Sequence, residues 1–342
     1  MPTTSKSAYL SRRPKAPPLS GVQHKLALSS ARNGQRYCMP VKGTLSDLIA
    51  KLPVKGDDSQ VFNEYACMQL AALAGVNIAQ CRMVPIREMA GRPELVEALG
   101  ADTHFLAVDR FDRGPSSAVH MEDACQLLRL MSGQKYAGRE YFVRLVQVLN
   151  RFSTRGIEDV RQFFICQTVN TLLGNSDAHL KNFSMLYHNG LMPELSSAYG
   201  IVCVAALPGF QGFGTNVAID QYQRKETVDD FLSVAKSAGI SERIARAAVK
   251  QTVSRAKELW PKRSPTYPLP MRCAPKSSYG SIPFRWRDSG GRRAPARCRD
   301  IFFGSDAYFR VNLRPAGHLS HLTGYTAHQD NYETTAHAAN PS

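Results

Sequence analysis

The segment from 174 to 183 reads GNSDAHLKNF, and it lies directly after a strongly apolar stretch. Residues Asp159 to Leu173 carry apolar side chains at helical spacing, and Gly174 is a typical helix stop. The chain then becomes polar and irregular, with Asp177 and Asn182 five residues apart. A short irregular loop can direct two such side chains at different partners, so this loop is the first candidate for a functional site.

An Asp and an Asn at this spacing occur in the catalytic loop of protein kinases. There the Asp accepts the proton of the attacking hydroxyl, and the Asn oxygen holds a magnesium ion that bridges the phosphates. The corresponding residues here are Asp177 and Asn182, and both are candidate magnesium ligands. By spacing alone, an ordinary polar loop between a helix and a strand remains the simpler interpretation.

Five further segments make a resemblance specific through their order along the chain. They read SGVQHKL at 20–26, IAKLP at 49–53, NEY at 63–65, AVDRFDR at 107–113 and HMEDACQ at 120–126. With the loop at 174–183, the chain resembles the HipA family of bacterial serine/threonine protein kinases, the toxins of toxin–antitoxin pairs. Each motif is weak alone, but six in order over residues 18–200 argue against a chance match.

The resemblance implies which residues bind ATP. Gly21, Gln23 and Lys25 lie in the family's glycine-rich segment. Lys51 matches the strand lysine that contacts nucleotide phosphates, and Glu64 would hold it in place as an ion-pair partner. Without that context, Lys51 would be interpreted as an ordinary solvated lysine at a strand edge.

The resemblance also assigns Asp109 and Phe111 to the hinge that contacts adenine. In the catalytic loop it makes Asp177 the catalytic base, His179 a hydrogen-bonding residue that orients the loop, and Lys181 a residue that steadies the transferred phosphate. The cofactors implied are ATP and Mg²⁺.

Ser20 lies in the loop where members of the family autophosphorylate. A phosphate there would add roughly −1.5 to −2 charge beside the nucleotide site and could eject the loop. The alternative is that Ser20 is only a turn residue. The family often has a second serine two residues earlier, where this chain has Pro18, so we expect its autoregulation to differ.

One position departs from the family pattern at a magnesium ligand. The family reads close to LSPAYD downstream of the catalytic loop, and its Asp binds magnesium. This chain reads LSSAYG at 195–200, so Gly200 stands where the Asp is expected. Glycine offers no carboxylate, and no nearby acid is an obvious substitute, although Glu194 is close in sequence.

The pattern of short strands followed by helices predicts an α+β protein with two lobes, like a protein kinase. We expect a disordered basic segment at 1–17, a strand-rich N-lobe at 18–113 and a helical C-lobe at 114–261. Residues 262–342 show no sustained period, which indicates either a disordered tail or a sequence out of its proper frame. The apolar run Ile201–Leu207 has the length of a buried strand.

Within these lobes, periodicity predicts individual elements. Strands are expected at 22–28, 48–52 and 103–111, with an extended segment at 76–85. Helices are expected at 60–75, 141–152, 159–173, 227–239 and 241–260.

Composition restricts the class of protein. The formal net charge is +15. Part of this excess comes from Arg263 onward, where the sequence contains ten arginines and one lysine but only five acidic residues. The rest is a weak signal for nucleic-acid binding, because no basic run is interleaved with aromatic residues. The eight cysteines form no CxxC pair, which is typical of reduced thiols in a cytoplasmic protein and argues against zinc. The sequence contains no apolar run of about 18 residues, so it predicts no membrane-spanning helix. Its basic N-terminus is not followed by the apolar core of a secretory signal.

The sequence leaves three functions open. The first is an ATP-dependent kinase toxin, whose substrate by resemblance would be an aminoacyl-tRNA synthetase. Its partners would be a helix-turn-helix antitoxin, operator DNA through that antitoxin, and a separate small protein replacing a subdomain of about a hundred residues that longer members carry. The second is a pseudokinase that binds only nucleotide or antitoxin, which Gly200 favours. The third is a basic nucleic-acid-binding protein, which leaves the ordered motifs unexplained.

Overall fold

The computed structural model describes residues 23–30, 36–42, 44–114, 117–136, 138–188, 190–207, 227–263, 282–284 and 301–303. All of them belong to one compact unit of the chain. Within these residues no helix is long and apolar enough to cross a membrane.

A five-stranded antiparallel sheet forms the N-terminal part, with strand order β2-β1-β3-β5-β4. Its strands are β1 Lys25–Ser30, β2 Tyr37–Cys38, β3 Leu48–Lys51, β4 Cys81–Pro85 and β5 His104–Asp109. The register of β1 and β3 sets Lys25 directly opposite Lys51. Directly opposed residues project from the same face of a sheet, so the two lysines are neighbours.

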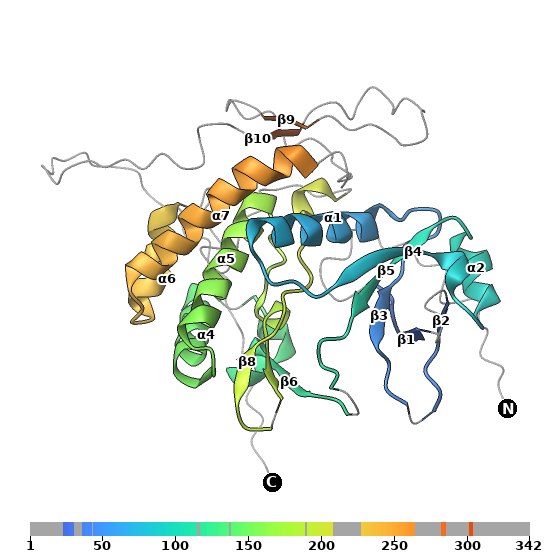
Figure 1. Cartoon of the computed structure of the whole chain (residues 1–342), viewed down its shortest axis with the longest axis horizontal. Helices are drawn as coiled ribbons and strands as arrows, with labels where there is room; N and C mark the ends of the chain where they lie inside the picture. The colour runs from blue at the N-terminus through green and yellow to red at the C-terminus, as the bar shows by residue number, and fades with distance from the viewer. Residues whose placement is uncertain are drawn as a thin grey trace, which may run out of the picture. The chain divides into compact units, whose positions relative to one another are not determined.

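Helix α1, Ser59–Ala74, lies between this sheet and the C-terminal helices (Figure 1). It packs against β4 and β5 on one side and against α5 and α7 on the other. Gly75 ends the helix in the left-handed conformation, with a φ of 104°, which glycine adopts without strain. The short elements η2 Ile86–Glu88 and α2 Pro93–Leu99 connect β4 to β5.

Four longer helices build the C-terminal part: α4 Arg139–Phe152, α5 Ile157–Leu173, α6 Val228–Ser237 and α7 Glu242–Arg263. Their core contains the rings of Phe142, Phe163 and Phe183, which pack against one another in tilted and edge-on arrangements. Trp260 joins the helices to α1, because its buried Nε1 donates to Leu70 O at 2.9 Å.

A three-stranded antiparallel sheet, in the order β6-β7-β8, carries the candidate loop. Its strands are β6 His120–Asp123, β7 Ser184–Tyr187 and β8 Pro193–Leu195. The short elements around it are α3 Ala124–Leu127, η3 Ser132–Gln134, η4 Leu180–Asn182 and η5 Val204–Ala206. The loop from 174 to 183 thus connects α5 to β7.

The α+β class is confirmed, and so are the five expected helices, to within a few residues at their ends. The apolar run Ile201–Leu207 has the length of a buried strand but forms none, and Val204–Ala206 within it is a 3-10 turn. In the predicted tail, β9 Ile282–Phe284 pairs with β10 Ile301–Phe303, and most of the other residues lie outside the described part. The domain boundaries remain predictions.

Candidate active site

Buried amides fix the backbone of the loop that carries Asp177. Asn175 is almost fully buried, and its Nδ2 donates to Asn170 Oδ1 on α5 at 2.9 Å. The backbone N–H of Asp177 donates to Asn175 Oδ1 at 3.2 Å. Asn182 Nδ2 then donates to the carbonyl oxygen of Asp177 at 2.8 Å. The two ends of the predicted catalytic loop are therefore brought together by the Asn182 amide.

Lys51 and Glu64 form a buried ion pair between β3 and α1, and their side chains are 13% and 5% exposed. Lys25 faces the same pair from β1. Burial, and then the charge of Lys51, lower the pKa of Lys25, whereas Glu64 and Asp177 act in the opposite direction. Two ammonium groups and one carboxylate leave an excess of positive charge here, which suits an anion such as a phosphate.

His179 is neutral near pH 7. Burial, followed by the charge of Lys135, lowers the pKa of His179 to about 4. Its Nε2 lies 3.8 Å from Asp177 Oδ1, so the two residues are neighbours without forming an ion pair at that pH. The buried Nδ1 of His179 has no hydrogen-bond partner within the described residues, so its role in orienting the loop remains a prediction.

Lys181 is bound to the strand next to the loop. Its Nζ lies 2.5 Å from Asp123 Oδ2, at the end of β6. The buried hydroxyl of Tyr199 donates to the Lys181 carbonyl at 2.8 Å and also meets Ser184 Oγ at 2.7 Å. Lys181 is thus already engaged by Asp123, and steadying a phosphate would require it to share that contact.

The predicted hinge residues separate in the structure. Asp109 accepts from Arg82 Nη1 at 2.5 Å, and Arg82 Nε also donates to the Tyr37 hydroxyl. Phe111 instead packs against Tyr199, with ring centroids 5.5 Å apart, which brings it toward the catalytic loop. Contact of either residue with adenine remains a prediction.

The glycine-rich segment is described only in part. Gln23 Nε2 donates to Leu52 O at 3.4 Å, which ties the start of β1 to the end of β3. Ser20 and Gly21 lie outside the described residues.

The comparison with protein families decides the relationship. The model of the HipA-like C-terminal domain matches residues 18–260. The chain belongs to this family. The resemblance predicted from the ordered motifs is thereby confirmed.

Two curated relatives from Sinorhizobium fredii carry kinase names. The protein named "Putative kinase Y4dM" is 29% identical over 80% of the chain, and "Putative kinase Y4mE" is 30% identical over 70% of it. The chain spans 66% and 55% of the lengths of these relatives. The family and these names support a kinase-like function and nucleotide binding in general.

One protein chain in a solved complex of HipA, HipB and operator DNA from Shewanella oneidensis MR-1 has the same fold as this chain. Its similarity to the chain gives a TM-score of 0.58 at 22% identity, over 78% of this chain and 62% of that one. The predicted two-lobed, kinase-like HipA fold is confirmed by this match.

Gly200 lies next to Asn182, as expected for the family position that binds magnesium. A Cβ placed on Gly200 would stand 3.4 Å from Asn182 Oδ1. Gly200 has a φ of 68°, in the left-handed region that favours glycine. The site of this HipA-family chain therefore has the amide that is predicted to bind metal, without the carboxylate that would face it.

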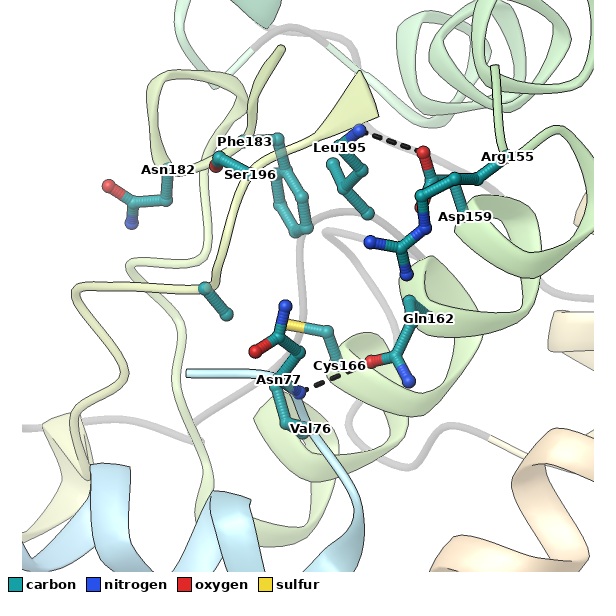
Figure 2. A pocket seen from close by; sticks show the side chains of 11 residues that line it. Val76, Asn77, Arg155, Asp159, Gln162, Cys166, Asn182, Phe183, Leu195 and Ser196 are labelled. Atoms are coloured by element: carbon teal, nitrogen blue, oxygen red, sulfur yellow. Dashed lines mark hydrogen bonds and ion pairs between the residues drawn. The ribbon is translucent and has the colours of Figure 1, made fainter. Parts of the chain in front are cut away.

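A small pocket lies on the other side of Asn182 (Figure 2). Figure 2 shows the Asn182 amide turned away from Asp159, which is fully buried. Asp159 pairs with Arg155 Nε at 3.2 Å and accepts from the backbone N–H of Leu195 at 2.7 Å. Asp159 therefore holds the start of α5 to β8.

Sequence reasoning missed two residues that contact the predicted site. Asn63 is fully buried, and its amide makes two hydrogen bonds to the backbone of Cys203, three residues after Gly200. The hydroxyl of Tyr136 donates to Asp177 Oδ1. Asn63 lies in the NEY motif beside Glu64, which was a usable signal, whereas nothing in the sequence around Tyr136 pointed to Asp177.

Proposed function

We propose that the chain is an ATP-dependent serine/threonine protein kinase that transfers the γ-phosphate of ATP to a protein serine. The observation that carries this proposal is the opposition of Lys25 and Lys51 on one sheet face, within electrostatic reach of Asp177. Like charges directly opposite each other destabilise a sheet. Phosphate oxygens between them would convert that repulsion into attraction.

Lys51 would contact the α- and β-phosphates as a point charge, because Glu64 holds its ammonium group in place. Lys25 would neutralise the phosphates further along the same face. Its lowered pKa favours this role, since a bound anion restores the charged form that burial disfavours. These donors fit a nucleoside triphosphate.

The donors for magnesium are fewer than in the family pattern. Asn182 Oδ1 is directed toward Gly200, and Asp177 supplies the nearby carboxylate. No group of three or more His, Cys, Asp or Glu side chains gathers anywhere in the described part of the chain. Mg²⁺ is commonly held by one or two carboxylates, phosphates and water, so Asn182 and Asp177 fit one ion held largely by ATP. Such an ion would neutralise charge on the phosphates.

Asp177 would act as the base that takes the proton of the acceptor hydroxyl. His179, neutral and buried beside it, would fix the direction of the loop. Lys181 would exchange part of its contact with Asp123 for the transferring phosphate. These roles need no movement of the loop backbone, which the Asn175 and Asn182 amides already hold.

By family resemblance, we further propose a toxin role with a helix-turn-helix antitoxin as partner. DNA would be contacted through that antitoxin, and a separate small protein would supply the subdomain that longer members carry. The solved HipA–HipB–DNA complex supports an antitoxin partner for a chain of this fold. An aminoacyl-tRNA synthetase as substrate and Ser20 as an autophosphorylation site rest on the resemblance alone.

Gly200 favours a second candidate function, a pseudokinase that binds nucleotide or antitoxin without transfer. The carboxylate that would clamp the metal and the γ-phosphate is missing beside Asn182. An Asp at position 200 would restore it, and Asp tolerates the left-handed conformation better than most residues do.

Incubation with labelled ATP and Mg²⁺ separates the two candidates. The variants are Asp177→Ala and Gly200→Asp, with Asp102→Ala as the control, because Asp102 is a fully exposed carboxylate. A kinase labels a protein serine in the native and Asp102→Ala chains and loses that label in Asp177→Ala. A label that appears only in Gly200→Asp identifies a pseudokinase. ATP binding without label in any variant contradicts the kinase proposal.

A further inference from the structure

The hydroxyl of Tyr136 occupies the place at Asp177 where an acceptor hydroxyl would bind. It donates a hydrogen bond to Asp177 Oδ1. The ring of Tyr136 stands edge-on to His179, at 5.2 Å between ring centroids. Lys135 Nζ lies 4.9 Å from the centroid of the same ring. The phenol is thus held against the predicted catalytic base by its neighbours on both sides.

This contact satisfies the first geometric requirement of phosphoryl transfer. A catalytic base must reach the proton of the acceptor hydroxyl, and Tyr136 brings that proton to Asp177. Lys25, on the phosphate-binding face, lies within electrostatic reach of both Asp177 and Lys135. The phenolic oxygen is therefore close to where the γ-phosphate of a bound nucleotide is expected.

A purely structural role accounts poorly for Tyr136. Tyr136 is 38% exposed. It follows the short 3-10 turn η3 and does not belong to a long helix or strand. Tyr199 differs: it is half-buried, and its hydroxyl lies between Ser184 Oγ and the Lys181 carbonyl. Burial raises the pKa of Tyr199 to about 12. The hydroxyl of Tyr136 instead meets the one carboxylate that the proposed reaction uses as a base.

We propose that Tyr136 is an intramolecular phosphoacceptor, an autophosphorylated tyrosine at the active site. This inference rests on the proposed kinase function. In the step, the phenolic oxygen of Tyr136 bonds to the γ-phosphorus of ATP, and the O–H proton passes to Asp177. The bond from the γ-phosphorus to its bridging oxygen breaks, and ADP leaves.

The product has a suitable counterion and a consequence for the site. Phosphotyrosine would carry roughly −1.5 to −2 charge, and Lys135 is close enough to pair with it. The same charge is repelled by Asp177, so the modified ring would leave the carboxylate. Asp177 would then be open to the hydroxyl of a protein substrate.

The test is phosphosite mapping by mass spectrometry after incubation of the full chain with ATP and Mg²⁺. The variants are Tyr136→Phe and Tyr141→Phe, each of which removes one phenolic oxygen; Tyr141 lies in α4, beside Arg144. We expect phosphotyrosine at 136 in the native chain and in Tyr141→Phe. Its rate constant should be independent of protein concentration, because the transfer is intramolecular.

Three outcomes would overturn the inference, and they differ in what they say about the kinase. Label on serine alone, in both the native chain and Tyr136→Phe, removes the phosphoacceptor and leaves the proposed function intact. A Tyr136 label whose rate rises with protein concentration shows transfer between molecules and not within one. ATP binding without label on any residue removes both proposals. Because the readout is made on the native chain, it does not depend on whether a variant folds.

Discussion

Replacing Asn63 with alanine is expected to loosen the segment that follows Gly200 from helix α1. Asn63 Nδ2 donates to Cys203 O at 2.9 Å, and the Cys203 N–H donates to Asn63 Oδ1 at 2.8 Å. The Asn63 side chain is fully buried. Its removal leaves one donor and one acceptor of the Cys203 backbone without these partners.

The magnitude follows from those two groups. An unsatisfied buried polar group costs about 1–3 kcal/mol, and alanine returns about 0.6 kcal/mol of helix propensity. Two such groups, less the helix-propensity gain, should lower the free energy of unfolding by about 1.5–5 kcal/mol. For a domain of this size, each kcal/mol lowers Tm by about 2–4 °C.

Urea unfolding followed by circular dichroism measures this change, with Gln60→Ala as the control. Gln60 lies one turn earlier on α1 and is half-buried. The control should lose much less stability than Asn63→Ala. If the two variants lose the same amount, water or another group satisfies Cys203, and the proposed connection between α1 and the segment after Gly200 is wrong.

Two further predictions concern residues around the catalytic loop. Burial, and then the charge of Lys135, lower the pKa of His179 to about 4, whereas the histidine of the unfolded chain has its ordinary pKa near 6.5. The unfolded state then binds more protons than the folded state, so the free energy of unfolding falls as pH drops from 6.5 toward 4. Urea unfolding at the two pH values should show a smaller fall for His179→Gln than for the native chain. An equal fall in both would contradict a neutral His179 in the folded state. Asp159→Ala should cost about 1–3 kcal/mol in the same assay, because it leaves the Leu195 N–H unpaired, while Arg155 is partly exposed and stays solvated. Glu158→Ala, which truncates an exposed neighbour, should change little. A small effect at Asp159 would mean that β8 is held to α5 by other contacts.

Local patterns were sufficient to predict the elements that carry the site. Helix α1 and the loop after α5 both depend on signals within a few residues: helical spacing of apolar residues, followed by Gly75 or Gly174 in the left-handed conformation. The expected pairing of Lys51 with Glu64 is present for the same reason, since strand and helix are close in sequence.

Long-range contacts explain what the sequence did not predict. Asn63 and Cys203 are 140 residues apart, and Tyr136 and Asp177 are 41 apart, so no local period connects them. The length of the apolar run Ile201–Leu207 suited a buried strand, but the run forms none. Its apolar side chains are largely buried, but its backbone is held by Asn63 rather than by a neighbouring strand.

The role of Asp109 was also beyond the sequence. The hinge motif gives its position but not its partner, and in the structure its carboxylate is bound by Arg82 across the β4–β5 pair. Arg82 carried no functional signal, because an arginine in a strand is usually a solvated surface residue.

Isothermal titration of ATP in the presence of Mg²⁺ tests most directly whether Lys51 is the centre of a nucleotide site. The variants are Lys51→Ala and Lys55→Ala, the latter an exposed lysine a few residues away. The native chain and Lys55→Ala should bind ATP alike. Lys51→Ala should bind at least about tenfold more weakly, a loss of about 1.4 kcal/mol, because a charged donor is lost and Glu64 is left facing the phosphates. No ATP binding by the native chain, or equal affinity in Lys51→Ala, would contradict the nucleotide site described here.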